Sequence, residues 1–298
     1  MSVSSLFESN KLVNFRKKVF YLILYWSILL SAGSFIARFM GINFMTSYWG
    51  KDISAVGYFG GLTNHSMLLG PISGLSTIFL IYRFLITKNS ILLILAVMSI
   101  GSLMFSASRA ALLSTILGLA VLIYILNKSS KYIIQYSILL IILGSITFPY
   151  WNNALSGVAE KNGGSAIELS TSTRDSKWEN RLNEFESDPL LGIGFSCVDL
   201  NNHADYSSEG GTETGSSWLS VLSMTGILGA STLLIILIKA FSNIYHSSAP
   251  DVSLVGAILM FFIVSMMAEG YIFAGGNFLC IMFWLSLGRA IDINSFYL

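Results

Sequence analysis

Long apolar stretches alternate with short polar connections along the chain, and eight of these stretches are long enough to cross a bilayer. The pattern predicts an all-α integral membrane protein with about eight transmembrane helices. The predicted spans are Val19–Ala37, Ser66–Ile86, Ser90–Ala107, Ala110–Leu126, Tyr132–Tyr150, Ser217–Phe241, Ser253–Ile272 and Asn277–Ile291. The chain therefore divides into membrane helices 1–5 (residues 1–150), one long polar loop (151–216) and membrane helices 6–8 (217–298).

The long loop contains one short amphipathic helix. N-cap residues cluster at Thr171–Asp175, and Arg174, Trp178, Arg181 and Phe185 then recur at helical spacing on one face. Pro189 requires the helix to end before it. The apolar stretch Pro189–Phe195 is expected at the membrane surface, and the polar stretch Ser196–Gly215 is expected to be irregular.

Composition supports the membrane assignment and excludes other classes. Apolar residues make up 54% of the chain and charged residues only 11%, against roughly 25% charged in a soluble domain. Lys and Arg number 17 against 16 Asp and Glu, so there is no basic excess for binding nucleic acid. Two cysteines are too few for a disulfide framework.

Basic residues also predict the orientation. The larger share lies in connections that are cytoplasmic if the N-terminus is inside, which is the usual bias of membrane proteins. We therefore expect cytoplasmic N- and C-termini in a bacterial inner membrane and a periplasmic long loop.

Arg109 is the most informative single residue, because it lies between two predicted spans that have almost no loop between them. An arginine there costs free energy unless it meets an anion, a carboxylate or water. It is either an interfacial arginine that extends to lipid headgroups or a phosphate ligand, whose oxygens a guanidinium can bind in pairs. Position alone leaves both interpretations open.

The loop and its borders supply further candidates. Arg174 and Arg181 share the polar side of the loop helix and are either phosphate ligands or part of a solvated face. Glu213 and Glu269 lie at outer mouths of the predicted spans and are candidate general bases. The alternative for Glu269 is an ion pair with Arg109 or Arg38.

Two histidines are secondary candidates. His65 stands at the outer end of the second predicted span, where a hydrogen-bonded structural role is the more common one. His203 lies among Asp199, Asn201 and Asp205, but this stretch lacks the glycine and the final glutamate of a calcium-binding loop. We therefore expect neither a metal nor another cofactor.

Several short motifs follow one another in a characteristic order. Ser108-Arg109-Ala-Ala-Leu-Leu opens a span, and Thr173-Arg174-x-x-x-Trp178 lies in the loop. Asp188-Pro-Leu-Leu-Gly-Ile-Gly follows, and then Trp218-Leu-x-x-Leu-x-x-x-Gly226-Ile-Leu-Gly229. With Glu269-Gly-Tyr-Ile-Phe before the last span, this order resembles the bacterial O-antigen ligase and O-antigen polymerase superfamily over about 60–287.

The resemblance implies a multi-span inner-membrane glycosyltransferase that takes glycan from undecaprenyl pyrophosphate without a nucleotide sugar. It implies that Arg109 and Arg174 match the family's Ser-Arg and Thr-Arg arginines. The expected partners are a lipid-linked glycan donor and acceptor and the bilayer, with further polysaccharide-assembly proteins left open.

Two departures bear on the activity. Ligases of this superfamily commonly carry a His-Asn pair where this chain has Gly215-Ser216, and the chain is shorter than usual members. We therefore expect a surface-polysaccharide polymerase, with Glu213 before Glu269 as the general base. An O-antigen ligase acting on lipid A-core or protein is the alternative within the class. A glycan or lipid transporter and a non-catalytic assembly scaffold are the alternatives outside it.

Overall fold

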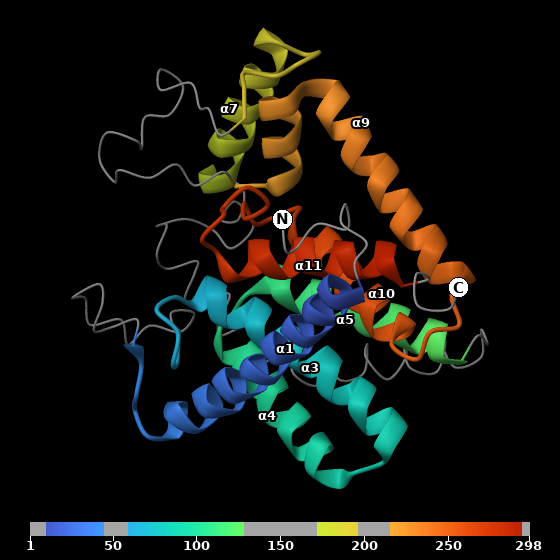
Figure 1. Ribbon diagram of the computed structural model, residues 1–298. Coiled ribbons are helices and arrows are strands. Elements are labelled where there is room, and N and C mark those ends of the chain that lie inside the picture. The colour runs from blue at the N-terminus through green and yellow to red at the C-terminus, as the bar shows by residue number, and fades with distance from the viewer. Residues whose placement is uncertain (1–9, 45–58, 128–171, 196–214, 294–298) are drawn as a thin grey trace.

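The computed structural model describes residues 10–44, 59–127, 172–195 and 215–293 (Figure 1). These residues form eight helices and no strand. The helices are α1 (Asn10–Phe39), α3 (Ser66–Thr87), α4 (Ser90–Phe105), α5 (Arg109–Asn127), α7 (Ser172–Ser187), α9 (Ser217–His246), α10 (Val252–Ser265) and α11 (Phe278–Asp292).

Four of these helices, α1, α3, α5 and α9, are long and apolar enough to cross a membrane, and α4 and α10 are shorter apolar helices. Together they make the chain a multi-pass membrane protein. The predicted loop helix is confirmed as α7, which ends at Ser187 before Pro189 as expected. The fifth predicted span, Tyr132–Tyr150, lies outside the described residues.

Two predicted spans differ from the observed helices, one by an internal break and the other by its length. The sixth was predicted as one continuous helix, but α9 is broken at Gly226, which has the non-helical angles φ 62° and ψ −168°. The seventh was predicted to reach Ile272, but α10 ends at Ser265 after 14 residues. Its last carbonyls accept from the following turn and from α9: Glu269 N–H donates to Ser265 O at 3.0 Å, and Trp218 Nε1 of α9 donates to Ile263 O at 3.0 Å.

The core surrounds α10, which is apolar on all sides and buried along almost its whole length. α5 and α3 pack along it, and α11 and α9 also contact it. Glycines permit this close packing. A Cβ on Gly118 of α5 would lie 3.0 Å from the carbonyl oxygen of Ala257, so a larger residue there would push the two helices apart.

The bundle has two ends with different chemistry. At the first, which we call the Asp251 end, Arg16 pairs with Asp292 at 2.6 Å and Arg289 pairs with Asp251 at 2.7 Å. These buried pairs tie together α1, α11 and the start of α10. At the opposite end, which we call the Glu269 end, the turn after α10 meets the start of α9. In Figure 1, α7 and the first part of α9 lie together beyond this end, and the rest of α9 runs back along the bundle.

Candidate functional site

The break in α9 is filled by the segment Pro189–Phe195, which follows α7 directly. In an unbroken helix, the N–H groups of Ile227 and Leu228 would donate to the carbonyls of Ser223 and Met224. Here the N–H groups of Ile227 and Leu228 donate to the carbonyls of Pro189 and Leu190 instead, at 2.9 and 3.3 Å.

The freed carbonyls are satisfied from the same segment. Ser223 O accepts from Ile193 N–H at 3.0 Å, and Met224 O accepts from Gly194 N–H at 3.2 Å. Four hydrogen bonds between the two chain segments therefore replace two within the helix, and the N–H groups and carbonyls that the break separates all find new partners.

Glycines make this exchange possible. Gly226, Gly192 and Gly194 all have positive φ, at 62°, 72° and 113°. A Cβ on Gly226 would collide with the carbonyl of Leu190, and a Cβ on Gly192 would lie 2.6 Å from the carbonyl oxygen of Ser223. The Asp188-Pro-Leu-Leu-Gly-Ile-Gly motif and the Gly226-Ile-Leu-Gly229 motif are thus two halves of one interlocked structure.

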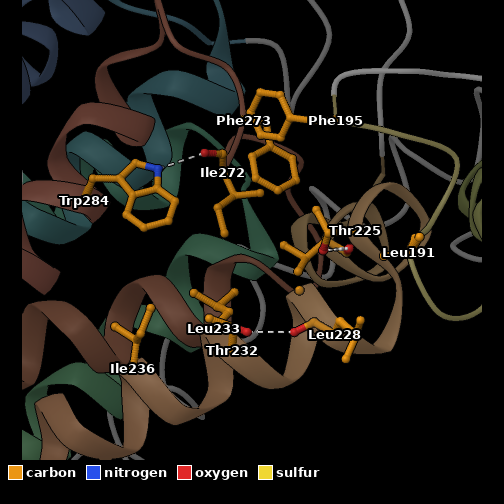
Figure 2. Close-up of a pocket in the computed structure, with 12 residues that line it drawn as sticks. Leu191, Phe195, Thr225, Leu228, Thr232, Leu233, Ile236, Ile272, Phe273 and Trp284 are labelled. Atoms are coloured by element: carbon orange, nitrogen blue, oxygen red, sulfur yellow. Dashed lines mark hydrogen bonds between the residues drawn. The ribbon is translucent and has the colours of Figure 1, made fainter.

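An apolar groove of about 470 Å³ opens beside this interlocked structure (Figure 2). Leu191 and Phe195 contribute from the segment, and α9, the turn after α10 and Trp284 of α11 form the rest of the lining. Phe195 meets Phe273 edge to face, with ring centroids 4.8 Å apart. The hydroxyls of Thr225 and Thr232 donate to carbonyls of their own helix, so they do not offer a free donor to an occupant. The described lining therefore suits a hydrocarbon chain.

Arg181 connects α7 to the last turn of α9 before the break. It is 1% exposed, and its Nη1 donates to Glu184 Oε2 at 2.8 Å and to Ser223 Oγ at 3.4 Å. Burial lowers the pKa of the guanidinium from its ordinary value, and the Glu184 carboxylate opposes that shift. The solvated-face alternative is therefore wrong for Arg181. Its Nε and Nη2 meet no hydrogen-bond acceptor among the described residues.

Arg109 begins α5 and is exposed, directly after a tight turn in which Ala107 has φ 52°. Its guanidinium forms no ion pair or hydrogen bond with any side chain in the described part of the chain. Arg38 lies instead against aromatic rings, 5.5 Å from the centroid of Phe59 and 5.7 Å from that of Phe105. Neither arginine pairs with Glu269 among the described residues.

Glu269 is half-buried in the turn between α10 and α11. Ser217, the first residue of α9, holds the turn on both sides of Glu269. The Ser217 hydroxyl donates to Glu269 O at 2.6 Å and accepts from Tyr271 N–H at 3.0 Å. The turn that contains Glu269 is thus attached to the start of α9. Glu213 lies a few residues before that start in the sequence.

The remaining candidates are placed in part. His65 caps α3, and its Nδ1 accepts from Met67 N–H at 3.0 Å, a hydrogen bond that a structural role would make. Arg174 lies in the first turn of α7, and its side chain is outside the described part of the structure. Glu213 and His203 also lie outside the described residues. Within the described ranges no three His, Cys, Asp or Glu side chains gather as metal ligands would.

Two features of the structure were not predicted from the sequence: the buried ion pairs at the Asp251 end and the break in α9. The hydropathy pattern gave no sign that Arg16 and Arg289 would be buried in ion pairs. The break in α9 was equally hidden, although three glycines within the two motifs were a usable signal.

Comparison with known proteins agrees with the motifs. Residues 91–234 match the family model described as O-antigen ligase. This range begins in α4 and ends in α9, so it includes Arg109, α7, the Pro189–Phe195 segment and the break. No curated protein matches the chain. The resemblance to the O-antigen ligase and polymerase superfamily is confirmed.

Proposed function

We propose that this chain, whose residues 91–234 match the O-antigen ligase family, is a polymerase that extends a surface polysaccharide on its lipid carrier. The observation that carries the proposal is the interlocked pair of motifs beside an apolar groove. A groove lined by hydrocarbon side chains supports a lipid-linked donor, because a free sugar would find no hydrogen-bonding partners in it.

The proposed reaction forms one bond and breaks one. A hydroxyl oxygen of the acceptor glycan attacks the anomeric carbon of the donor glycan. The bond from that carbon to undecaprenyl pyrophosphate breaks, and its electron pair leaves with the diphosphate. Diphosphate is already a good leaving group, so the protein must chiefly neutralise its charge and orient the two sugars.

Arg109 and Arg174 are proposed to bind the diphosphate. The exposure of Arg109 and its lack of a partner among the described residues support this role, because a ligand arginine must be free before substrate arrives. For Arg181 we propose a positioning role instead of direct contact. Its burial and its pair with Glu184 suit it to hold α7, and with it Arg174, against α9.

A carboxylate is proposed to take the proton from the attacking hydroxyl. Glu213 is the first candidate and Glu269 the second. The hydrogen bonds from Ser217 to Glu269 O and from Tyr271 N–H to Ser217 fix the backbone of this turn, which supports a defined position for the Glu269 carboxylate.

Ligation is the second candidate function, and the description of the matching family as O-antigen ligase favours it. The Gly215-Ser216 dipeptide, where ligases commonly have His-Asn, favours polymerisation. The glycans of a strain lacking the gene separate the two. A single repeat unit on the acceptor identifies a polymerase, whereas accumulated long lipid-linked chains identify a ligase and refute our first proposal.

We further propose that the long loop is periplasmic in a bacterial inner membrane. Cys197 in this loop is the natural probe. In cells with a permeabilised outer membrane, a membrane-impermeant thiol reagent should label it. Labelling only after the inner membrane is broken would show that the loop is cytoplasmic and would refute the proposed topology.

A further inference from the structure

A second groove lies on the surface of α1 near its start, at the Asp251 end of the bundle. It encloses about 530 Å³ and is lined by Asn14, Lys17, Lys18, Tyr21, Leu22 and Tyr25. The Glu269 end, where the proposed reaction takes place, is at the opposite end of the helices. The occupant of this groove is therefore separate from the diphosphate of the donor.

The charges in the groove are not neutralised by the described part of the chain. Arg16, Lys17 and Lys18 are consecutive, but Arg16 turns inward and pairs with Asp292 at 2.6 Å. Asp251, the other nearby acid, pairs with Arg289. Lys17 and Lys18 point outward, are exposed, and form no ion pair with a described residue. Among the described residues no carboxylate therefore pairs with either lysine, and Asp251, which accepts from the groove's Tyr21 at 3.5 Å, is already paired with Arg289.

The lining changes from polar to apolar along the helix axis. Asn14 and the two lysines stand nearest the start of α1, and Leu22 and Tyr25, which are 56% and 49% exposed, follow further along the span. From Asn14 to Tyr25 the axial rise is about 16 Å. This is the length of a phospholipid headgroup with its glycerol and the upper part of its acyl chains.

We infer that this groove binds an anionic phospholipid, with its phosphate at Lys17 and Lys18 and its upper acyl chains along Leu22 and Tyr25. Charge selects the ligand, because two lysines at the membrane surface that form no ion pair with a described residue attract an anionic headgroup and give a zwitterionic one little advantage. The apolar half of the groove selects a lipid over a soluble phosphate, which would leave that half exposed to water.

The test uses the purified full-length protein in a neutral detergent. It is titrated with dioleoylphosphatidylglycerol and dioleoylphosphatidylcholine, and bound lipid is counted by native mass spectrometry. We expect the wild type to retain phosphatidylglycerol preferentially. Lys17→Ala and Lys18→Ala should each reduce the preference about 5-fold, and the double variant about 25-fold.

Lys88 provides the matched control. It is exposed at the same end of the bundle, after α3, and is not part of the groove. Lys88→Ala should leave the preference unchanged, and the double variant Lys17→Arg, Lys18→Arg should keep it because both charges remain. Lys17 and Lys18 are exposed, so their variants should unfold at the wild-type temperature.

Several results would overturn the inference. One is equal retention of the two lipids by the wild type, and another is an unchanged preference in the double alanine variant. An equal loss in Lys88→Ala would mean general surface charge instead of a site. Displacement of the lipid by glycerol phosphate would mean that the lysines bind a soluble phosphate.

Discussion

Replacing Gly226 by alanine should release the Pro189–Phe195 segment from α9. Gly226 has φ 62° and ψ −168°, a conformation that is essentially restricted to glycine, and an added Cβ would collide with the carbonyl of Leu190. Such backbone strain costs about 1–3 kcal/mol. Alanine also favours a continuous helix over glycine by about 1 kcal/mol.

These two effects act in the same direction. In a continuous α9 the backbone groups near Gly226 would pair within the helix, and the Pro189–Phe195 segment would lose its hydrogen bonds to α9. The balance should therefore shift by about 2–4 kcal/mol towards the released state. Local opening would become about 30- to 700-fold more frequent if the segment opens independently of the bundle.

Hydrogen exchange of the protein in lipid nanodiscs measures this directly. The amides of Ile193 and Gly194, which donate to α9, should exchange faster in Gly226→Ala by that factor. Gly276→Ala is the matched control, since a Cβ there meets no atom within 4 Å and its φ is not positive. Wild-type exchange at both amides in Gly226→Ala, together with wild-type glycan chains in cells, would refute the argument that the break holds the Pro189–Phe195 segment against α9.

Three further predictions concern the proposed site. Arg109→Lys should fail nearly as badly as Arg109→Ala in glycan chain formation at matched membrane abundance, with a loss of roughly 10- to 150-fold, because lysine cannot bind the diphosphate with two parallel donors. Glycan chains of wild-type length from the Arg109→Lys variant would contradict diphosphate binding and favour an interfacial arginine that extends to lipid headgroups. Glu184→Gln should destabilise the docking of α7 on α9 by about 3–5 kcal/mol, since it leaves the buried Arg181 charge without its carboxylate. Limited proteolysis of α7 checks this, and wild-type resistance would contradict it. Turnover of lipid-linked substrate should continue in excess chelator, and complete loss restored by Mg²⁺ or Ca²⁺ would contradict the arginine-based mechanism.

Hydropathy predicted the existence of the helices well. An apolar run that spans a bilayer must pair its own backbone N–H and C=O groups, and a single segment does this only as a helix. The start of α3 at Ser66 and the end of α7 before Pro189 both follow from local signals. Hydropathy did not predict the break at Gly226, because an apolar sequence is equally compatible with a straight and a broken helix. The break depends on a partner segment 32–37 residues earlier in the chain, and local pattern contains no information about that contact.

The candidate site was predictable only as a set of residue types. Arg181 lies on the face that the helical spacing assigned to it, but whether that face meets water or α9 depends on tertiary packing. Its partner Glu184, three residues later, was visible in the sequence as an ordinary surface acid. The lack of a described partner for Arg109 could not be predicted either, because the sequence left an ion pair with Glu269 equally open, and only the packing of the helices decides between the two.

The buried pair of Arg16 and Asp292 joins the first and last described helices, across 276 residues of sequence. At about 5–20 residues per second, a ribosome needs roughly 14–55 s to deliver Asp292 after Arg16 has been made. During that time α1 contains an arginine whose final partner does not exist, and a buried unpaired charge is strongly unfavourable. Arg16 must therefore stay at the membrane surface until α11 arrives. A chain that terminates before Asp292 lacks this pair, so the join between the first and last described helices reports that synthesis has been completed.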